Sequence, residues 1–139
     1  MEITTNANQE KEMIENFSVD RTKRLVRDVS GTRSYTHYAS LQALKDVAFY
    51  FQTHSFGVTK RDLWRELNQH PMTQLSVALS FLQDRGCVQL YRKKNYPCSI
   101  AVLEDAMVEF YALDVAATEY YSFLEEKKNE QKNKQTATD

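Results

Sequence analysis

Residues 59–103 read TKRDLWRELNQHPMTQLSVALSFLQDRGCVQLYRKKNYPCSIAVL, and this stretch decides the fold that the sequence predicts. It opens with a short helix, because Thr59 and Asp62 stand at the two side-chain positions of a capping box. After a proline turn, apolar residues at helical spacing predict a second helix over residues 73–84, which ends before Gly86. The apolar period then changes to two, which indicates a β-hairpin. The predicted order is therefore helix, turn, helix and hairpin.

The hairpin is expected to turn at residues 93–95, which are Lys-Lys-Asn. With a two-residue turn centred on the second and third of these, Cys98 faces Tyr91 and Cys87 faces Val102 across the hairpin. This register separates the two thiols and argues against a disulfide within the chain. Both cysteines are interpreted as small strand residues, while an intersubunit disulfide and redox control remain open alternatives.

The side of helix 73–84 that faces away from the apolar residues carries small polar side chains. A helix that enters the major groove of DNA needs such a surface, because bulky groups hold its backbone away from the base edges. Gln74 is expected to contact adenine and Val77 a thymine methyl group. Ordinary solvated helix positions are the alternative interpretation. The residues expected to contact DNA from this helix are Thr73, Gln74, Ser76, Val77 and Ser80.

Basic residues surround the predicted helix pair. The net charge is only −1, but residues 21–34 and 40–103 each carry +4, while residues 104–126 carry −7. Segregation of this kind attracts the DNA phosphate backbone to one face of a protein. Whether the first basic segment touches DNA is left open. The cations expected to hold phosphates are Lys60, Arg61, Arg92, Lys93 and Lys94.

The segment from Ser40 to Leu103 resembles the winged helix-turn-helix transcription regulators, and among them the MarR-like group. The resemblance is carried by Thr73-Gln74-Leu75-Ser76, Leu79, Leu82, Arg85-Gly86-Cys87-Val88 and Tyr91-Arg92-Lys93-Lys94-Asn95-Tyr96. It implies a recognition helix over 73–84 in the major groove and a basic wing over 91–96 on the backbone or in the minor groove. Val77, where such proteins often have arginine, and the short wing depart from the pattern.

The last predicted element is a helix over residues 104–128, which would be about 38 Å long when counted from the preceding Leu103. Apolar residues recur along it with heptad spacing, which is typical of a helix that packs along another helix. Packing within the chain is the alternative to dimerisation. Residues 129–139 are expected to be a disordered tail. The expected dimer interface consists of Leu103, Phe110, Leu113, Ala117, Tyr120 and Leu124.

Residues 1–39 are expected to form an N-terminal arm with short helices. Residues 1–10 are polar and are expected to be a frayed tail, and residues 11–27 show a weak helical pattern. Ser30-Gly31-Thr32 breaks this pattern, and residues 35–39 read as an aromatic linker. The predicted fold class is therefore mainly α with a small β-hairpin wing, comprising this arm, a winged helix domain over 40–103 and a long C-terminal dimerisation helix.

The sequence gives no support to several other classes of protein. It contains none of the common nucleotide-binding or hydrolase motifs, so no enzymatic activity and no cofactor are expected. Its cysteines and histidines form no metal-binding pattern. The absence of a membrane-spanning run and of a secretion signal favours a cytoplasmic location. The expected function is sequence-specific binding of double-stranded DNA as a homodimeric transcription regulator, with any small-molecule effector left open. The alternatives are a winged helix adaptor for protein contacts and a DNA-binding module of a replication or mobile-element system.

Overall fold

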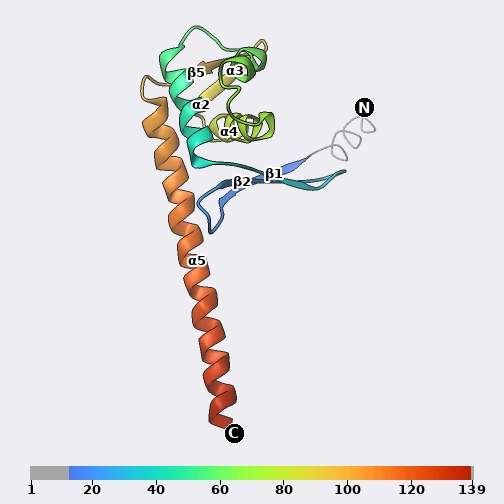
Figure 1. Ribbon diagram of the computed structural model, residues 1–139, viewed down its shortest axis with the longest axis vertical. Helices are drawn as coiled ribbons and strands as arrows, with labels where there is room; N and C mark the ends of the chain where they lie inside the picture. The colour runs from blue at the N-terminus through green and yellow to red at the C-terminus, as the bar shows by residue number, and fades with distance from the viewer. Residues whose placement is uncertain (1–12, 139) are drawn as a thin grey trace, which may run out of the picture.

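A computed structural model describes residues 13–138 of the chain, and the side chains of residues 13–132. Within these residues the protein is a mixed α/β structure with four helices, a three-stranded antiparallel sheet and a two-stranded hairpin. Figure 1 shows the shorter helices and the hairpin gathered at one end of the long helix α5 (Val102–Thr138), with the three-stranded sheet crossing beside it. No helix in the described part of the chain has the length and apolar character to cross a membrane.

The N-terminal region forms a sheet, so the prediction of short helices and an aromatic linker there is wrong. Strands β1 (Ile14–Val19), β2 (Leu25–Ser30) and β3 (Tyr35–Ala39) pair in that order, each antiparallel to the next. One face of the sheet buries alternate residues, including Phe17 and Leu25, as expected for strands with one buried face. The predicted frayed tail over residues 1–10 lies outside the described residues.

The turn between β1 and β2 is organised by one carboxylate. Asp20 accepts hydrogen bonds from the backbone N–H groups of Thr22 and Arg24, at 3.0 and 2.9 Å. Lys23, between them, adopts a left-handed backbone conformation with φ of 64°. Aspartate favours turns because its side chain bonds to the backbone a few residues ahead. The predicted break at residues 30–32 is confirmed as the turn that joins β2 to β3.

Helices α3 (Lys60–Glu66) and α4 (Met72–Asp84) lie where the sequence predicts a helix pair, and helix α2 (Leu41–Thr53) precedes them. The hydroxyl of Ser40 caps α2 by accepting a hydrogen bond from the N–H of Ala43 at 3.0 Å. Both hydrogen bonds of the predicted capping box are present at the start of α3. These three helices enclose a core of leucine, valine, alanine and phenylalanine side chains.

Strands β4 (Val88–Tyr91) and β5 (Lys94–Pro97) form the predicted hairpin, but the turn lies at Arg92 and Lys93. Both turn residues have positive φ, 50° and 70°, as a two-residue turn that follows the strand twist requires. The predicted turn, two residues further on, is therefore wrong, and Asn95 is buried in β5. Its backbone also pairs with Val58, which adds an isolated bridge beside the hairpin.

Helix α5 runs over Val102–Thr138. Its first turns belong to the core, where Val102, Ala106 and Phe110 are buried. Because the helix continues to Thr138, the prediction of a disordered tail is wrong for residues 129–138. The run of lysine, glutamate and glutamine that reads as a tail also has good helix propensity.

Candidate nucleic-acid interface

Helix α4 is packed on two sides. Leu75, Ala78 and Leu79 are buried in the core beneath it. A second side faces the three-stranded sheet, where the ring of Phe81 meets the ring of Phe17 edge-on at 5.3 Å between centroids. The third side, a narrow stripe, is the only part of this helix that remains for another molecule among the described residues. It begins at Thr73, near the N-terminal end of the helix.

The structure separates the five residues predicted to contact DNA from α4. Thr73 is exposed, and Ser76 and Ser80 are half-buried on the free stripe. Val77 is fully buried, so the predicted contact with a thymine methyl group is wrong. The side-chain carbonyl of Gln74 accepts a hydrogen bond from the backbone N–H of Ser40 at 2.9 Å, so this amide is already engaged. The side of α4 that carries Val77 is covered by the three-stranded sheet, which the sequence analysis does not predict.

The free stripe opens into a cleft of about 320 Å³ between α3 and the inner face of the sheet. Its floor is formed by Thr73 and Ser76. A wide aromatic side chain from α3 and polar or aromatic side chains from the sheet form its walls, and the cleft therefore offers hydroxyl, imidazole and guanidinium groups on one side of α4. Its wall residues are Trp64, Met72, Arg27, Tyr35 and His37.

The predicted cations of the hairpin and of α3 are all exposed. Arg92 lies at the turn, with its guanidinium 5.2 Å from the centre of the Tyr91 ring. Lys94 lies in β5, close enough to α3 to act on Asp62. The pKa of Asp62 is below its usual value, mainly through hydrogen bonds from Thr59 and to a smaller degree through Arg65 and Lys94. The hairpin and the start of α3 therefore present their cations beside each other. The cations predicted to contact DNA from α3 are Lys60 and Arg61, in its first turn.

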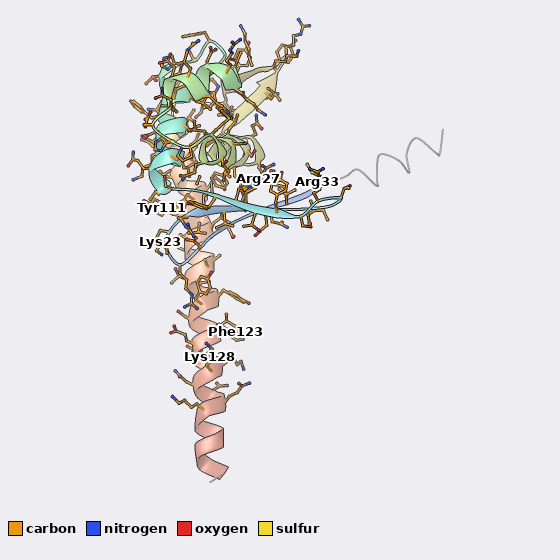
Figure 2. The ribbon with its side chains drawn as sticks, turned by 45° about the vertical axis from the view of Figure 1, so that its right-hand side comes forward. Lys23, Arg27, Arg33, Tyr111, Phe123 and Lys128 are labelled. Carbon is orange, nitrogen blue, oxygen red and sulfur yellow. The ribbon has the colours of Figure 1, made fainter. Side chains whose placement is uncertain are left out.

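Most cations of the basic segment 21–34 are engaged within the chain. The Nζ atom of Lys23 lies 2.6 Å from a carboxylate oxygen of Asp114 on α5, and Arg21 lies over the ring of Tyr121. Arg24 and Arg27 pair with Asp20 and Glu15. Figure 2 shows Arg33 at the end of the sheet that points away from α5, where it is exposed. This segment mainly fastens the sheet to itself and to α5.

The predicted dimer interface is largely used by the chain itself. Phe110 is buried in the chain's own core, so the prediction that it pairs with a second copy is wrong. Leu103 and Leu113 pack partly against the same core, and Ala117 is half-buried beside the sheet. Packing within the chain, the alternative interpretation of the heptad pattern, therefore holds for the first half of α5. Further along α5, Tyr120 lines a hollow beside the sheet but is exposed, and Leu124 is half-buried.

Another face of α5 carries exposed apolar side chains that the sequence reading did not select. Val108, Tyr111 and Val115 follow the spacing i, i+3, i+7 and are 69%, 48% and 58% exposed. Phe123 is also exposed, and Figure 2 shows it on the part of α5 that extends beyond the sheet. This spacing places the three residues on one side of a helix. The same spacing is visible in the sequence, next to the longer heptad pattern that predicts the dimer interface.

Comparisons of the chain with protein-family models, with curated proteins and with solved structures found no match.

Proposed function

We propose that this protein is a winged helix DNA-binding protein that acts as a homodimeric transcription regulator, with α4 as its recognition helix. The observation that carries the proposal is the stripe of hydroxyl side chains on α4, Thr73, Ser76 and Ser80, beside exposed cations on α3 and on the hairpin. The order of elements, with a bridge at Val58 joined to the hairpin, agrees with a winged helix. Such a role would place the protein in the cytoplasm, with no catalytic function and no cofactor.

Small hydroxyl groups suit a helix that lies close to base edges, because they hydrogen-bond without holding the backbone away. Since Gln74 and Val77 serve the packing of the chain, base recognition falls to Thr73, Ser76 and Ser80. Serine and threonine bond to several bases and discriminate weakly among them. Most of the affinity is then expected to come from phosphate contacts, which makes binding strongly dependent on salt concentration.

The wing of this proposal is the β4–β5 hairpin, with Arg92 and Lys93 at its turn. Their left-handed backbone conformations direct the chain back sharply and leave both side chains exposed. Lys60 and Arg61, in the first turn of α3, lie beside the cations of the hairpin and are expected to hold phosphates together with them. Arg33, at the tip of the sheet, adds a further exposed cation.

The homodimer of this proposal forms through α5, with a second copy of the same helix as the partner. Support comes from the exposed row of Val108, Tyr111 and Val115, which has the spacing of a coiled-coil seam. The helix also continues from Glu125, which still lines the pocket beside the β1–β2 turn, to Thr138, about 20 Å further. A replacement of Val115 by glutamate is expected to convert the dimer to a monomer in light-scattering measurements. Gln131→Glu, which adds the same charge at an exposed position on the opposite side of α5, is the matched control.

The DNA contact is tested by removing the two charges of the hairpin turn without disturbing its backbone. Arg92→Asn with Lys93→Gly places in the turn the residue pair that most favours these left-handed conformations. Selection of bound sequences from random duplex DNA by the unmodified protein supplies the ligand. The dependence of the binding constant on salt concentration is then measured for both proteins.

The variant is expected to lower the slope of log K against log salt by roughly one to two, because each phosphate contact contributes about 0.9 to that slope. The matched control is Lys127→Ala with Lys128→Ala, which removes the same charge from the far part of α5 and is expected to leave the slope unchanged. Equal slopes for all three proteins, or no enrichment of any sequence, would contradict the proposal. A selected site with two half-sites one helical turn apart would support the dimer as well.

A second function, an adaptor for protein contacts, is favoured by one observation. Leu90 and Tyr91 of β4 are more than half exposed, and Phe56 in the loop before α3 is 74% exposed. Exposed apolar side chains of this size are typical of surfaces that bind other proteins. Absence of DNA binding, or binding that does not change with salt, would favour this function. A DNA-binding module of a replication or mobile-element system would share the DNA contact and behave like the first proposal in these measurements.

A further inference from the structure

The two cysteines face each other at the base of the hairpin. The backbone N–H of Cys98 donates a hydrogen bond of 3.0 Å to the carbonyl of Cys87, one step beyond the last strand pair, Val88 with Pro97. The expectation that the register separates them is therefore wrong, because the turn lies two residues earlier than predicted. Directly opposite residues of an antiparallel pair project their side chains to the same face. One of the two bonds of a hydrogen-bonded pair is present, because the N–H of Cys87 donates instead to the carbonyl of Leu82. A regular pair of this kind has its Cα atoms about 5.5 Å apart, which is within the range that a disulfide spans.

The two thiols have different surroundings. Cys98 is exposed in the connection that leads to α5, whereas Cys87 is 4% exposed beneath that helix. Burial, assisted by the carboxylates of Asp105 and Glu109, raises the pKa of Cys87 to about 11. A thiol reacts as its thiolate and must be reached by its partner. Cys98 is therefore the thiol that reacts first with a reagent from solution. Cys87 is the neighbouring thiol that can react with Cys98 afterwards.

We propose that Cys87 and Cys98 form a thiol–disulfide exchange site whose substrates are small disulfides such as oxidised glutathione. The thiolate of Cys98 attacks one sulfur of the small disulfide, forms a mixed disulfide and displaces one thiolate. Cys87 then loses its proton to solvent, and its sulfur attacks the sulfur of Cys98 and displaces the second thiolate. Two protein thiols are oxidised to one disulfide, and one small disulfide is reduced to two thiols.

The product is a cross-link at the base of the hairpin. The bond would close the loop of residues 87–98, which contains both strands and the turn between them. It would also join the end of α4, through Gly86, to the connection before α5. A closed loop of this kind restricts the unfolded chain and steadies the folded hairpin. The exchange site depends on this local geometry alone and stands whether or not the protein binds DNA.

The test uses the full chain, reduced, freed of reductant and then incubated with oxidised glutathione near neutral pH. Samples are quenched with acid, and the intact mass is followed with time. The unmodified protein is expected to show a transient glutathione adduct and then a mass lower than the reduced protein by two hydrogen atoms. Cys87→Ser is expected to keep its adduct on Cys98, and Cys98→Ser to form none while folded. Cys87→Ala, which keeps the buried position apolar, is expected to behave as Cys87→Ser does.

Three outcomes would overturn the inference. The first is a glutathione adduct that persists equally in the unmodified protein and in both Cys87 variants. The second is a disulfide between two chains through Cys98 with no internal bond. The third is an adduct on the Cys87 thiol of folded Cys98→Ser. Peptide mapping distinguishes these products, and thermal melting of each variant establishes that it is folded under the conditions of the reaction.

Discussion

The side-chain carbonyl oxygen of Gln74 accepts a hydrogen bond from the backbone N–H of Ser40, at 2.9 Å. Ser40 in turn caps α2 through its hydroxyl. One glutamine therefore joins the start of α4 to the start of α2, at the point where β3 ends. Gln74, which the sequence predicts to contact adenine, therefore links the sheet to the helices in the folded chain.

Replacement of Gln74 by alanine is expected to destabilise the protein and to leave its base preference unchanged. The change leaves the N–H of Ser40 without its partner, at a cost of about 1 kcal/mol in the free energy of unfolding. Urea denaturation measures this cost. Gln74→Glu, which keeps an oxygen acceptor, is expected to lose less stability than Gln74→Ala. A new base preference at one position of the selected DNA, with stability unchanged, would contradict this role.

Much of the helical region could be predicted from sequence because each signal there is local. The capping box of Thr59 and Asp62 and the apolar spacing of α2 depend only on neighbours along the chain. The N-terminal sheet could not, because its inner face mixes apolar residues with Arg27, whose charge is neutralised by Glu15 across the strand pair. A strand that carries a half-buried charge pair on its inner face does not show a clean apolar alternation.

The accessible residues of the candidate site could be predicted for the same reason. The hydroxyl residues of α4 and the cations of the hairpin are exposed or half-buried, since a small polar group and a charge, which keep a side chain at the surface, are visible in the sequence. Two predicted DNA contacts, Gln74 and Val77, are wrong. Gln74 bonds to the start of α2, and Val77 is buried on the side of α4 that the sheet covers. The hairpin turn was misplaced because Arg92 and Lys93 adopt left-handed conformations without the glycine or asparagine that usually signals them.

Asn95 holds the hairpin to the helices, and its removal is expected to be costly. Its side chain donates to the carbonyl of Val58 at 3.3 Å and accepts from the amide of Gln83 at 2.7 Å, and the residue is 1% exposed. Asn95→Ala leaves the amide of Gln83 without its partner, while the carbonyl of Val58 keeps its bond from the backbone N–H of residue 95, and the loss costs about 2 kcal/mol of stability. Urea denaturation provides the measurement, with the exposed Asn68→Ala as the matched control. Equal stabilities of the two variants would show that Asn95 is dispensable.

Two glycines with similar backbones offer a matched pair of substitutions. Gly57 and Gly86 have φ of 90° and 73°, so alanine is strained at both by roughly 1–2 kcal/mol. A Cβ at Gly57 would also lie 2.9 Å from the ring of Tyr96, whereas none of the described atoms lies within 4 Å of a Cβ at Gly86. Gly57→Ala is therefore expected to melt at a lower temperature than Gly86→Ala. The reverse order would show that the ring of Tyr96 moves away at little cost.

The turn at Asp20 is expected to make stability depend on pH in the acid range. Burial of this carboxylate acts to raise its pKa, but hydrogen bonds from the backbone of Arg24, the side chain of Thr22 and the guanidinium of Arg24 outweigh it and hold the pKa below 3.8. A carboxylate with a lowered pKa stabilises the folded state fully above its unfolded pKa, and this stabilisation is lost as the pH falls through the folded value.

The difference in stability between the unmodified protein and Asp20→Asn is therefore expected to be constant near neutral pH, at roughly 1–2 kcal/mol for bonds to a charged group. It is expected to shrink progressively once the pH falls below about 4, where the unfolded carboxyl begins to bind its proton. Urea denaturation of both proteins at a series of pH values measures the difference. Because asparagine keeps one oxygen acceptor and carries no titrating proton, a difference that stays level down to the acid limit would locate the stabilisation in the shape of the turn and not in the charge of Asp20.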